Sequence, residues 1–171
     1  DKYINRLRDY LNKLNAHYEG KVQIASIIGR YFAMDRDNRW DRVEKAYDSM
    51  TLGLGLHSFS ATEALTSASE RNETDEFVLP TNICGAEGSA TTIQNDDAII
   101  FFNFRPDRAR EITRCCTDDS LSGFTRKARP QGLHFTCMTQ YDASMPNVTV
   151  AYPPEALKNT FGEYISSLGL K

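Results

Sequence analysis

The stretch Ala98–Arg108 (AIIFFNFRPDR) places a run of five apolar residues before two closely spaced arginines. An unbroken apolar run of this length is typical of a buried strand in a parallel sheet. Pro106 suits the first position of a helix, and Asp107 supplies the negative charge that a helix N-terminus favours. The stretch therefore predicts a strand, a turn and a helix, with Arg105 and Arg108 at the turn.

A second pair of arginines follows another expected strand. The strand predicted at residues 22–28 is followed by Arg30 and, shortly after, by Arg36. In open α/β sheets, ligands bind beyond the carboxyl ends of the strands, and guanidinium groups bind carboxylates and phosphates there. If the two strands are neighbours, Arg30, Arg36, Arg105 and Arg108 converge on a small dianion. They would hold and orient it, because an arginine with a pKa above ~12 cannot serve as a general base.

The same arginines have a plainer interpretation as surface charges. Arg36 begins a series of three arginines at three-residue spacing, as on a solvated helix face with acidic neighbours. Arg105 and Arg108 have their own acidic neighbours, Asp107 and Glu111, with which they could pair. From the pattern alone, both interpretations stay open.

Hydrophobic periodicity predicts the remaining elements. Helices are expected at residues 2–16, 39–50, 61–69, 106–117 and 155–168, and strands at 22–28, 77–79, 98–102, 133–138 and 148–151. Ser60, with Glu63 three residues on, has the spacing of a capping box and predicts a helix start. Strands alternating with helices predict an α/β domain, layered α/β/α, with a mainly parallel central sheet.

Composition and motifs exclude several classes of function. The 171 residues suit a single domain, and 40% hydrophobic and 25% charged residues are ordinary globular values. A net charge of −3 argues against a nucleic-acid partner, and no apolar run approaches the ~20 residues that cross a bilayer. There is no phosphate-binding glycine loop and no G-x-S-x-G elbow. The scattered histidines and cysteines predict no metal site in this chain and reduced thiols.

Several segments of the chain resemble, in the same order, the signatures of a known family. They are Gly29–Asp37 (GRYFAMDRD) with Arg39–Val43 (RWDRV), Thr74–Thr81 (TDEFVLPT), Phe102–Arg108 (FNFRPDR) and Phe135–Thr139 (FTCMT). The family is that of the cofactor-independent, or 2,3-bisphosphoglycerate-independent, phosphoglycerate mutases. The resemblance covers nearly the whole chain.

The resemblance implies an isomerase of glycolysis and gluconeogenesis in the cytoplasm. Such enzymes interconvert 3-phosphoglycerate and 2-phosphoglycerate through a phosphoserine intermediate. Their phosphatase domain carries the serine nucleophile and two divalent metal ions, usually manganese, with magnesium or cobalt as alternatives. A phosphotransferase domain inserted into it grips the substrate.

The resemblance also implies which part of such an enzyme this chain is. Residues 1–153 are similar to most of the phosphotransferase domain, and residues 154–171 resemble the linker helix that returns to the phosphatase domain. The family arginines that contact substrate match Arg30, Arg36, Arg105 and Arg108. The family's substrate-binding histidine and Arg–Asp pair would lie upstream of Asp1.

The serine nucleophile, the metal ligands and a substrate-contacting lysine would lie in the phosphatase domain. We therefore expect no catalytic residue and no metal ligand in this chain, and no mutase activity from it alone. Two alternatives are a non-catalytic module that binds a phosphorylated small acid and a purely structural α/β domain.

Overall fold

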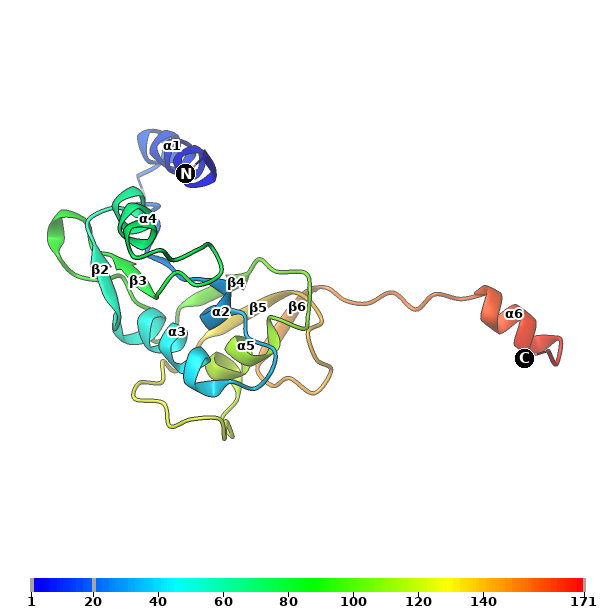
Figure 1. Ribbon diagram of the computed structural model, residues 1–171. Coiled ribbons are helices and arrows are strands. Elements are labelled where there is room, and N and C mark those ends of the chain that lie inside the picture. The colour runs from blue at the N-terminus through cyan, green and yellow to red at the C-terminus, as the bar shows by residue number, and fades with distance from the viewer. Residues whose placement is uncertain (1, 20, 171) are drawn as a thin grey trace.

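The computed structural model describes residues 2–19 and 21–170. In chain order its elements are α1 (Lys2–His17), β1 (Ser26–Ile27), α2 (Arg30–Ala33), α3 (Trp40–Leu52), β2 (Leu56–Ser58), α4 (Ala61–Glu70), β3 (Thr81–Ile83), the 3₁₀ turn η1 (Gly85–Glu87), β4 (Ala98–Phe101), α5 (Arg110–Thr117), β5 (His134–Thr139), β6 (Val148–Tyr152) and α6 (Phe161–Ser167). Strands and helices alternate along most of the chain, so the predicted α/β class is confirmed (Figure 1).

The described strands form two three-stranded sheets, where a single central sheet was expected. Sheet A has the order β1-β3-β2, with β1 antiparallel and β2 parallel to β3. Sheet B has the order β4-β5-β6 and is parallel throughout, with Ala98 opposite His134 and Phe135 opposite Val148. Parallel pairing therefore predominates, as the sequence indicates, but it is divided between two sheets.

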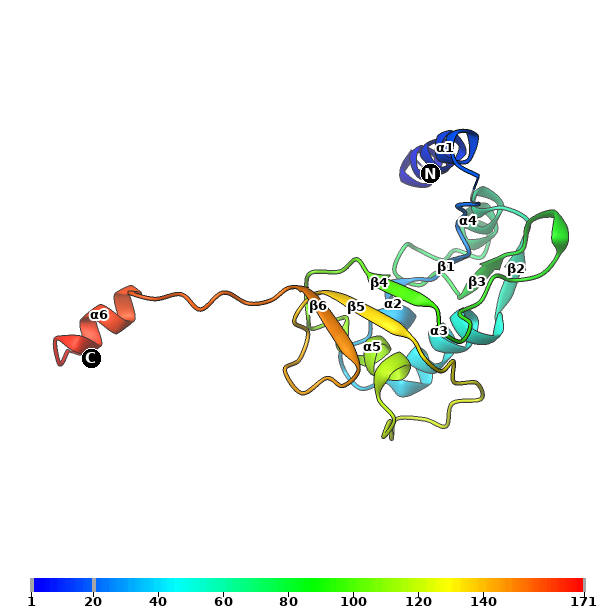
Figure 2. The same cartoon turned by 180° about the vertical axis from the view of Figure 1, so that it is seen from behind.

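The core lies between sheet B and the helices α2, α3 and α5, which cover one of its faces. Val43 and Tyr47 of α3 pack with Ile112 of α5, and Phe135 of β5 packs with Tyr141 just beyond that strand. Figure 2 shows the other face of sheet B turned to the viewer, with no described helix over it. The second helical layer of the expected α/β/α arrangement is thus not present in the described part of the chain.

Most predicted helices are confirmed with small changes at their ends. The helices expected at 2–16, 39–50 and 61–69 are α1, α3 and α4. The Ser60 hydroxyl accepts a hydrogen bond from the Glu63 backbone N–H at 3.2 Å, so the predicted N-cap of α4 is confirmed.

Two local predictions near the arginines are wrong. Residues 77–79 form no strand, because Phe77 N–H closes a turn on the Thr74 carbonyl and Leu79 N–H donates to the Glu73 carboxylate, so neither joins a ladder. The strand in this part of the chain is β3, just past Pro80. Pro106 does not begin the next helix, since its carbonyl accepts a hydrogen bond from Ala109 N–H and closes a turn. Helix α5 begins only at Arg110.

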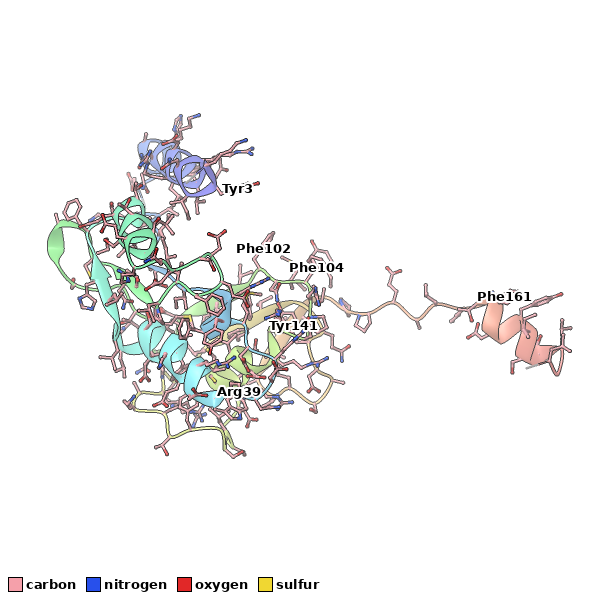
Figure 3. The ribbon with its side chains drawn as sticks, in the orientation of Figure 1. Tyr3, Arg39, Phe102, Phe104, Tyr141 and Phe161 are labelled. Carbon is pink, nitrogen blue, oxygen red and sulfur yellow. The ribbon has the colours of Figure 1, made fainter. Side chains whose placement is uncertain are left out.

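The strand expected at 22–28 and the last helix are shorter than predicted. Only Ser26–Ile27 pairs as a strand, and α6 begins at Phe161, capped by Thr160. Residues 153–160 form neither helix nor strand and carry α6 away from the body of the molecule, as the position of Phe161 in Figure 3 shows. Neither α1 nor α6 contains a buried residue. None of the helices in the described ranges is long and apolar enough to cross a membrane.

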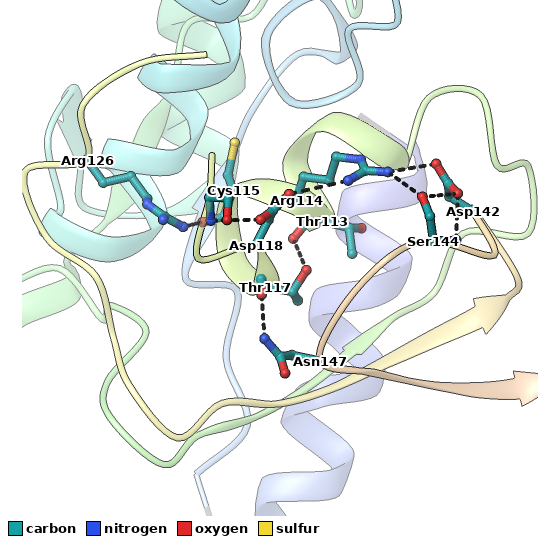
Figure 4. Close-up of polar contacts among 10 residues, drawn as sticks. Thr113, Arg114, Cys115, Thr117, Asp118, Arg126, Asp142, Ser144 and Asn147 are labelled. Atoms are coloured by element: carbon teal, nitrogen blue, oxygen red, sulfur yellow. Dashed lines mark hydrogen bonds and ion pairs between the residues drawn. The ribbon is translucent and has the colours of Figure 1, made fainter. Parts of the chain in front are cut away.

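Helix α5 is hydrogen-bonded to the loops around it (Figure 4). Arg114 Nη2 donates to Asp142 Oδ2 at 2.7 Å, and Asn147 Nδ2 donates to the Thr117 carbonyl at 2.9 Å. The side chain of Arg126 donates to a carbonyl of the same helix at 2.8 Å. These contacts fix the helix that directly follows the turn of residues 105–109.

Candidate anion-binding site

Arg105 follows β4 on a segment that is held by the end of β5. Thr139 Oγ1 donates to the Phe104 carbonyl at 2.7 Å, and the buried Tyr141 hydroxyl hydrogen-bonds the Asn103 carbonyl. Asn103 Nδ2 in turn donates to the Arg105 carbonyl at 2.9 Å. Figure 3 shows Tyr141 within the body of the molecule and Phe104 at its upper surface. Side chains beyond the strand therefore set the path of the backbone that leads to Arg105.

Arg30 is the first residue of α2 and is held from a different side. Gly29 N–H donates to the Val78 carbonyl at 2.8 Å, and Tyr31 N–H donates to the Glu76 carbonyl at 3.0 Å. A Cβ atom on Gly29 would lie 2.6 Å from Val78 N and closer still to the Glu76 carbonyl oxygen. Only glycine allows this approach, so the sequence Gly29-Arg30 sets where Arg30 begins its helix.

Two of the predicted arginines meet at a single carboxylate, and a third binds the loop beside them. Arg105 donates to both oxygens of Asp107, from Nε at 3.2 Å and from Nη2 at 3.0 Å. Arg36 Nη1 donates to Asp107 Oδ2 at 3.2 Å. Arg108 Nη1 donates to the Met34 carbonyl at 3.1 Å, beside the loop that carries Arg36. We call Arg36, Arg105, Arg108 and Asp107 the arginine cluster.

Arg30 belongs to a separate ion pair. Its Nη2 atom lies 2.7 Å from Glu76 Oε2, so it is tied to the segment that also holds Gly29. The pairing of Arg105 with Asp107 is what the plainer interpretation expects. Arg108, in contrast, does not pair with Glu111, because its guanidinium bonds a backbone carbonyl instead.

The cluster is open to water. The exposed fractions of the side chains are 47% for Arg36, 63% for Arg105 and 29% for Asp107. Hydrogen bonds from Arg105 and Arg36 hold the pKa of Asp107 below its ordinary value, so Asp107 is ionised at neutral pH. Exposed ion pairs contribute only about 0–1 kcal/mol to stability. A ligand anion can therefore compete for the same guanidinium donors at small cost.

Two buried acidic residues, Asp35 and Glu111, lie behind the cluster, and the sequence patterns did not predict their burial there. Asp35 Oδ2 accepts hydrogen bonds from the backbone N–H groups of Asp37 and Arg39, at 2.9 and 3.0 Å. An aspartate that bonds the N–H two residues on is the signature of an Asx turn, which could have been read from the sequence. The contact of Glu111 with Asn38 N–H spans 73 positions and has no local signal.

A cavity elsewhere in the molecule lies apart from the arginine cluster. It has a volume of about 560 Å³ and lies beside α1, with Asn15, Gln23 and Thr91 among its lining residues. None of the four predicted arginines lines it. Within residues 2–19 and 21–170 there is also no group of three or more His, Cys, Asp or Glu side chains that could hold a metal ion.

Comparison with known proteins decides the family. Residues 1–143 match the family described as "BPG-independent PGAM N-terminus". The chain belongs to the 2,3-bisphosphoglycerate-independent phosphoglycerate mutase family. The mutase of Acetivibrio thermocellus is 50% identical over 169 residues, which are 99% of this chain and 32% of the relative. That of Psychrobacter arcticus is 51% identical over 176 residues, with the same coverage.

A solved structure agrees with the fold of this mutase family member. The phosphoglycerate mutase of Leishmania mexicana, solved at low cobalt concentration, has a TM-score of 0.84 and 31% identity over 99% of this chain and 32% of that chain. The chain thus spans about a third of the length of the relatives it matches. The family resemblance read from the sequence is confirmed.

The segments that carry the mutase resemblance touch one another in the structure. Residues 29–37 meet residues 74–81 through Gly29 and Val78, and meet residues 102–108 through Arg36 and Asp107. Residues 135–139 meet residues 102–108 through Thr139 and Phe104. The family signature therefore surrounds one region of the surface, which contains the arginine cluster.

Proposed function

We propose that this chain supplies the substrate-holding arginines of a 2,3-bisphosphoglycerate-independent phosphoglycerate mutase. Such an enzyme interconverts 3-phosphoglycerate and 2-phosphoglycerate through a phosphoserine intermediate. The observation that most supports this role is that Arg36 and Arg105 both donate to the Asp107 carboxylate. The space between the two guanidinium groups already accommodates an anion of the size of a carboxylate.

On this proposal, the arginines bind and orient the ligand and transfer no proton. Phosphoglycerate carries a carboxylate and a phosphate, which suits two sets of guanidinium donors. Arg36, Arg105 and Arg108 form one set, and Arg30, released from Glu76, adds a further donor. Each charge-assisted hydrogen bond would contribute on the order of 1.5–3 kcal/mol to binding.

We further propose how the rest of the reaction is divided. Residues 1–153 act as the larger part of a phosphotransferase domain, and residues 154–171 link it to a phosphatase domain outside this chain. That partner domain supplies the serine nucleophile and two divalent metal ions, manganese with magnesium or cobalt as alternatives, and the enzyme acts in the cytoplasm. Family membership and the path of residues 153–160 away from the body of the molecule support this division.

The first test is thermal unfolding of this chain with and without 3-phosphoglycerate. A ligand that binds only the folded state adds about 2.7 kcal/mol at a hundredfold excess over its Kd. We expect a clear rise in the unfolding temperature of the wild type and a much smaller rise in Arg105→Ala. Arg6→Ala is the matched control, because it removes the same charge from the exposed surface of α1.

The outcomes separate ligand binding from general charge effects. Equal ligand shifts in wild type and Arg105→Ala would contradict a role for the cluster, and equal losses in Arg105→Ala and Arg6→Ala would indicate only nonspecific attraction. A coupled enzyme assay on the same samples should detect no mutase turnover. Turnover by this chain alone would refute the division of labour between two domains.

A further inference from the structure

Two buried carboxyl side chains lie directly behind the arginine cluster. Asp35 follows α2 and is 5% exposed, and Glu111 is the second residue of α5 and is 6% exposed. Both accept backbone N–H groups of the same turn, Asp35 from Asp37 and Arg39, and Glu111 from Asn38, so the two carboxyl groups are neighbours. Two neighbouring carboxylates that were both ionised would repel strongly where water is scarce, so the pair favours holding one proton.

Asp35 is the ionised member of the pair. Its Oδ2 atom accepts the backbone N–H groups of Asp37 and Arg39, and its Oδ1 atom lies 3.3 Å from Arg42 Nη1 of α3. Burial raises the pKa of Asp35, but these hydrogen bonds and the Arg42 charge hold it below its ordinary value. Its oxygens are thus committed as acceptors.

Glu111 has the surroundings of a protonated carboxyl. Its Oε1 atom accepts Asn38 N–H at 3.0 Å, whereas its Oε2 atom is buried and finds no donor among the described residues. Burial and the negative charges of Asp35 and Asp37 raise the pKa of Glu111. The other ionisable group that it faces, the Cys115 thiol one turn along α5, is itself kept neutral by burial.

We propose that Glu111 is a positioning residue of the arginine cluster, which in its protonated form donates a hydrogen bond to Asp35 while accepting one from Asn38. It thereby holds the loop of residues 34–39, which carries Arg36, against the start of α5. The inference rests on the proposed function, because the placement of Arg36 matters only if Arg36 binds a ligand.

The Glu111 link differs from the other contacts that join this loop to α5 and the turn before it. The Arg36–Asp107 pair lies in solvent, where hydrogen bonds are weak, whereas Glu111 and Asp35 are shielded from water. Asn38 adopts a left-handed backbone with φ of 56°, a conformation that surrounding contacts must support. The hydrogen bond from its N–H to Glu111 provides that support.

The test compares Glu111→Gln with Glu111→Ala in this chain. Glutamine keeps the shape and has a permanent donor and acceptor, so we expect hydrogen exchange of the Asn38 amide to match wild type. In Glu111→Ala the exchange should be about tenfold faster, since one buried hydrogen bond is lost. Equal exchange in all three proteins, or a glutamine variant as fast as the alanine variant, would overturn the proposal.

A second measurement needs no alanine variant and decides the matter even if that variant fails to fold. The infrared spectrum of the wild type at neutral pH should show the C=O band of a buried protonated carboxyl, which Glu111→Gln lacks. As the pH rises and Glu111 ionises, exchange at Asn38, corrected for its intrinsic pH dependence, should accelerate in wild type only. Absence of the band, or parallel pH curves, would refute a protonated Glu111.

Titration with 3-phosphoglycerate separates this inference from the proposed function. Glu111→Gln should bind as wild type does, and Glu111→Ala about tenfold more weakly, if Arg36 is misplaced by the loss of one hydrogen bond. No binding by wild type would refute the function, while the exchange and infrared results still decide the link. Equal affinity of wild type and Glu111→Ala would show that Glu111 does not position Arg36.

Discussion

Arg30 and Arg105 both follow strand ends, but different kinds of contact hold the backbone that carries each of them. Around Arg30, backbone groups of residues 29–31 bond backbone groups of residues 76–78, and Gly29 permits the close approach. Around Arg105, side chains from the end of β5 bond backbone carbonyls. Substitutions that add atoms should therefore disturb the backbone around Arg30, and substitutions that remove side-chain atoms should disturb the backbone before Arg105.

The largest effect should come from Gly29→Ala, which adds an atom to the closely packed backbone around Arg30. The new Cβ would meet Val78 N and the Glu76 carbonyl, which cannot move without breaking their own bonds. We expect a loss of about 3 kcal/mol in the free energy of unfolding, at the upper end of overpacking costs. Urea unfolding measures it. Gly162→Ala in the exposed helix α6 is the control and should be neutral or stabilising.

Tyr141→Phe should have the next largest effect, because it removes one of the hydroxyl groups that hold the backbone before Arg105. Its single proton is shared between the Asn103 and Phe101 carbonyls, and its oxygen accepts Met138 N–H. The Phe101 carbonyl also accepts Asn103 N–H, so the main loss is the donor to the Asn103 carbonyl. We expect this to cost about 2 kcal/mol of unfolding free energy and to weaken ligand binding through Arg105. Tyr10→Phe on the exposed face of α1 should change neither quantity. Unaltered ligand affinity in Tyr141→Phe would show that the hydroxyl does not position Arg105.

Thr139→Val removes another hydroxyl that holds the backbone before Arg105, with a smaller expected loss of stability. Valine keeps the shape of threonine but cannot donate to the Phe104 carbonyl, which is otherwise open to water. We expect a loss of about 0.5–1 kcal/mol in unfolding free energy. Thr149→Val in the neighbouring strand β6, where the threonine is exposed, controls for the change in composition. Equal losses in the two variants would mean that the hydrogen bond contributes nothing.

The smallest effect should come from titrating Asp107, which accepts hydrogen bonds from Arg105. Arg105 and Arg36 hold the pKa of Asp107 below its ordinary value, so its stabilising contribution is present above that value and is lost as the pH falls through the lowered pKa. Asp107→Asn should remove this part of the acid dependence. Thermal unfolding measured at a series of acidic pH values checks it, and identical acid limbs in both proteins would contradict the assignment.

Patterns within a few residues could be predicted well, and contacts between distant segments could not. Ser60 marks a helix start because its cap partner is three residues away. Asp35 could have been recognised as a turn-former for the same reason. Pro106 does not distinguish a helix start from a tight turn, since a proline fits both equally well.

The arrangement of the site depends on features that have no local signature. That Arg36 and Arg105 meet at Asp107 depends on how α2 and β4 are placed relative to one another. Sequence order gives no strand order, so the division into two sheets could not be derived. The hydrogen bond that Glu111 accepts from Asn38 likewise could not be predicted, because the two residues are 73 positions apart in the sequence.

The position of β4 has a consequence for how this protein behaves in solution. Within the described residues β4 pairs on one side only, and Ile100, Phe102 and Phe104 in and just after it are 73%, 84% and 72% exposed. A free strand edge beside an apolar row invites further strand pairing. This chain should therefore self-associate even at low concentration. A charged residue in place of Phe102 should keep it monodisperse to higher concentrations.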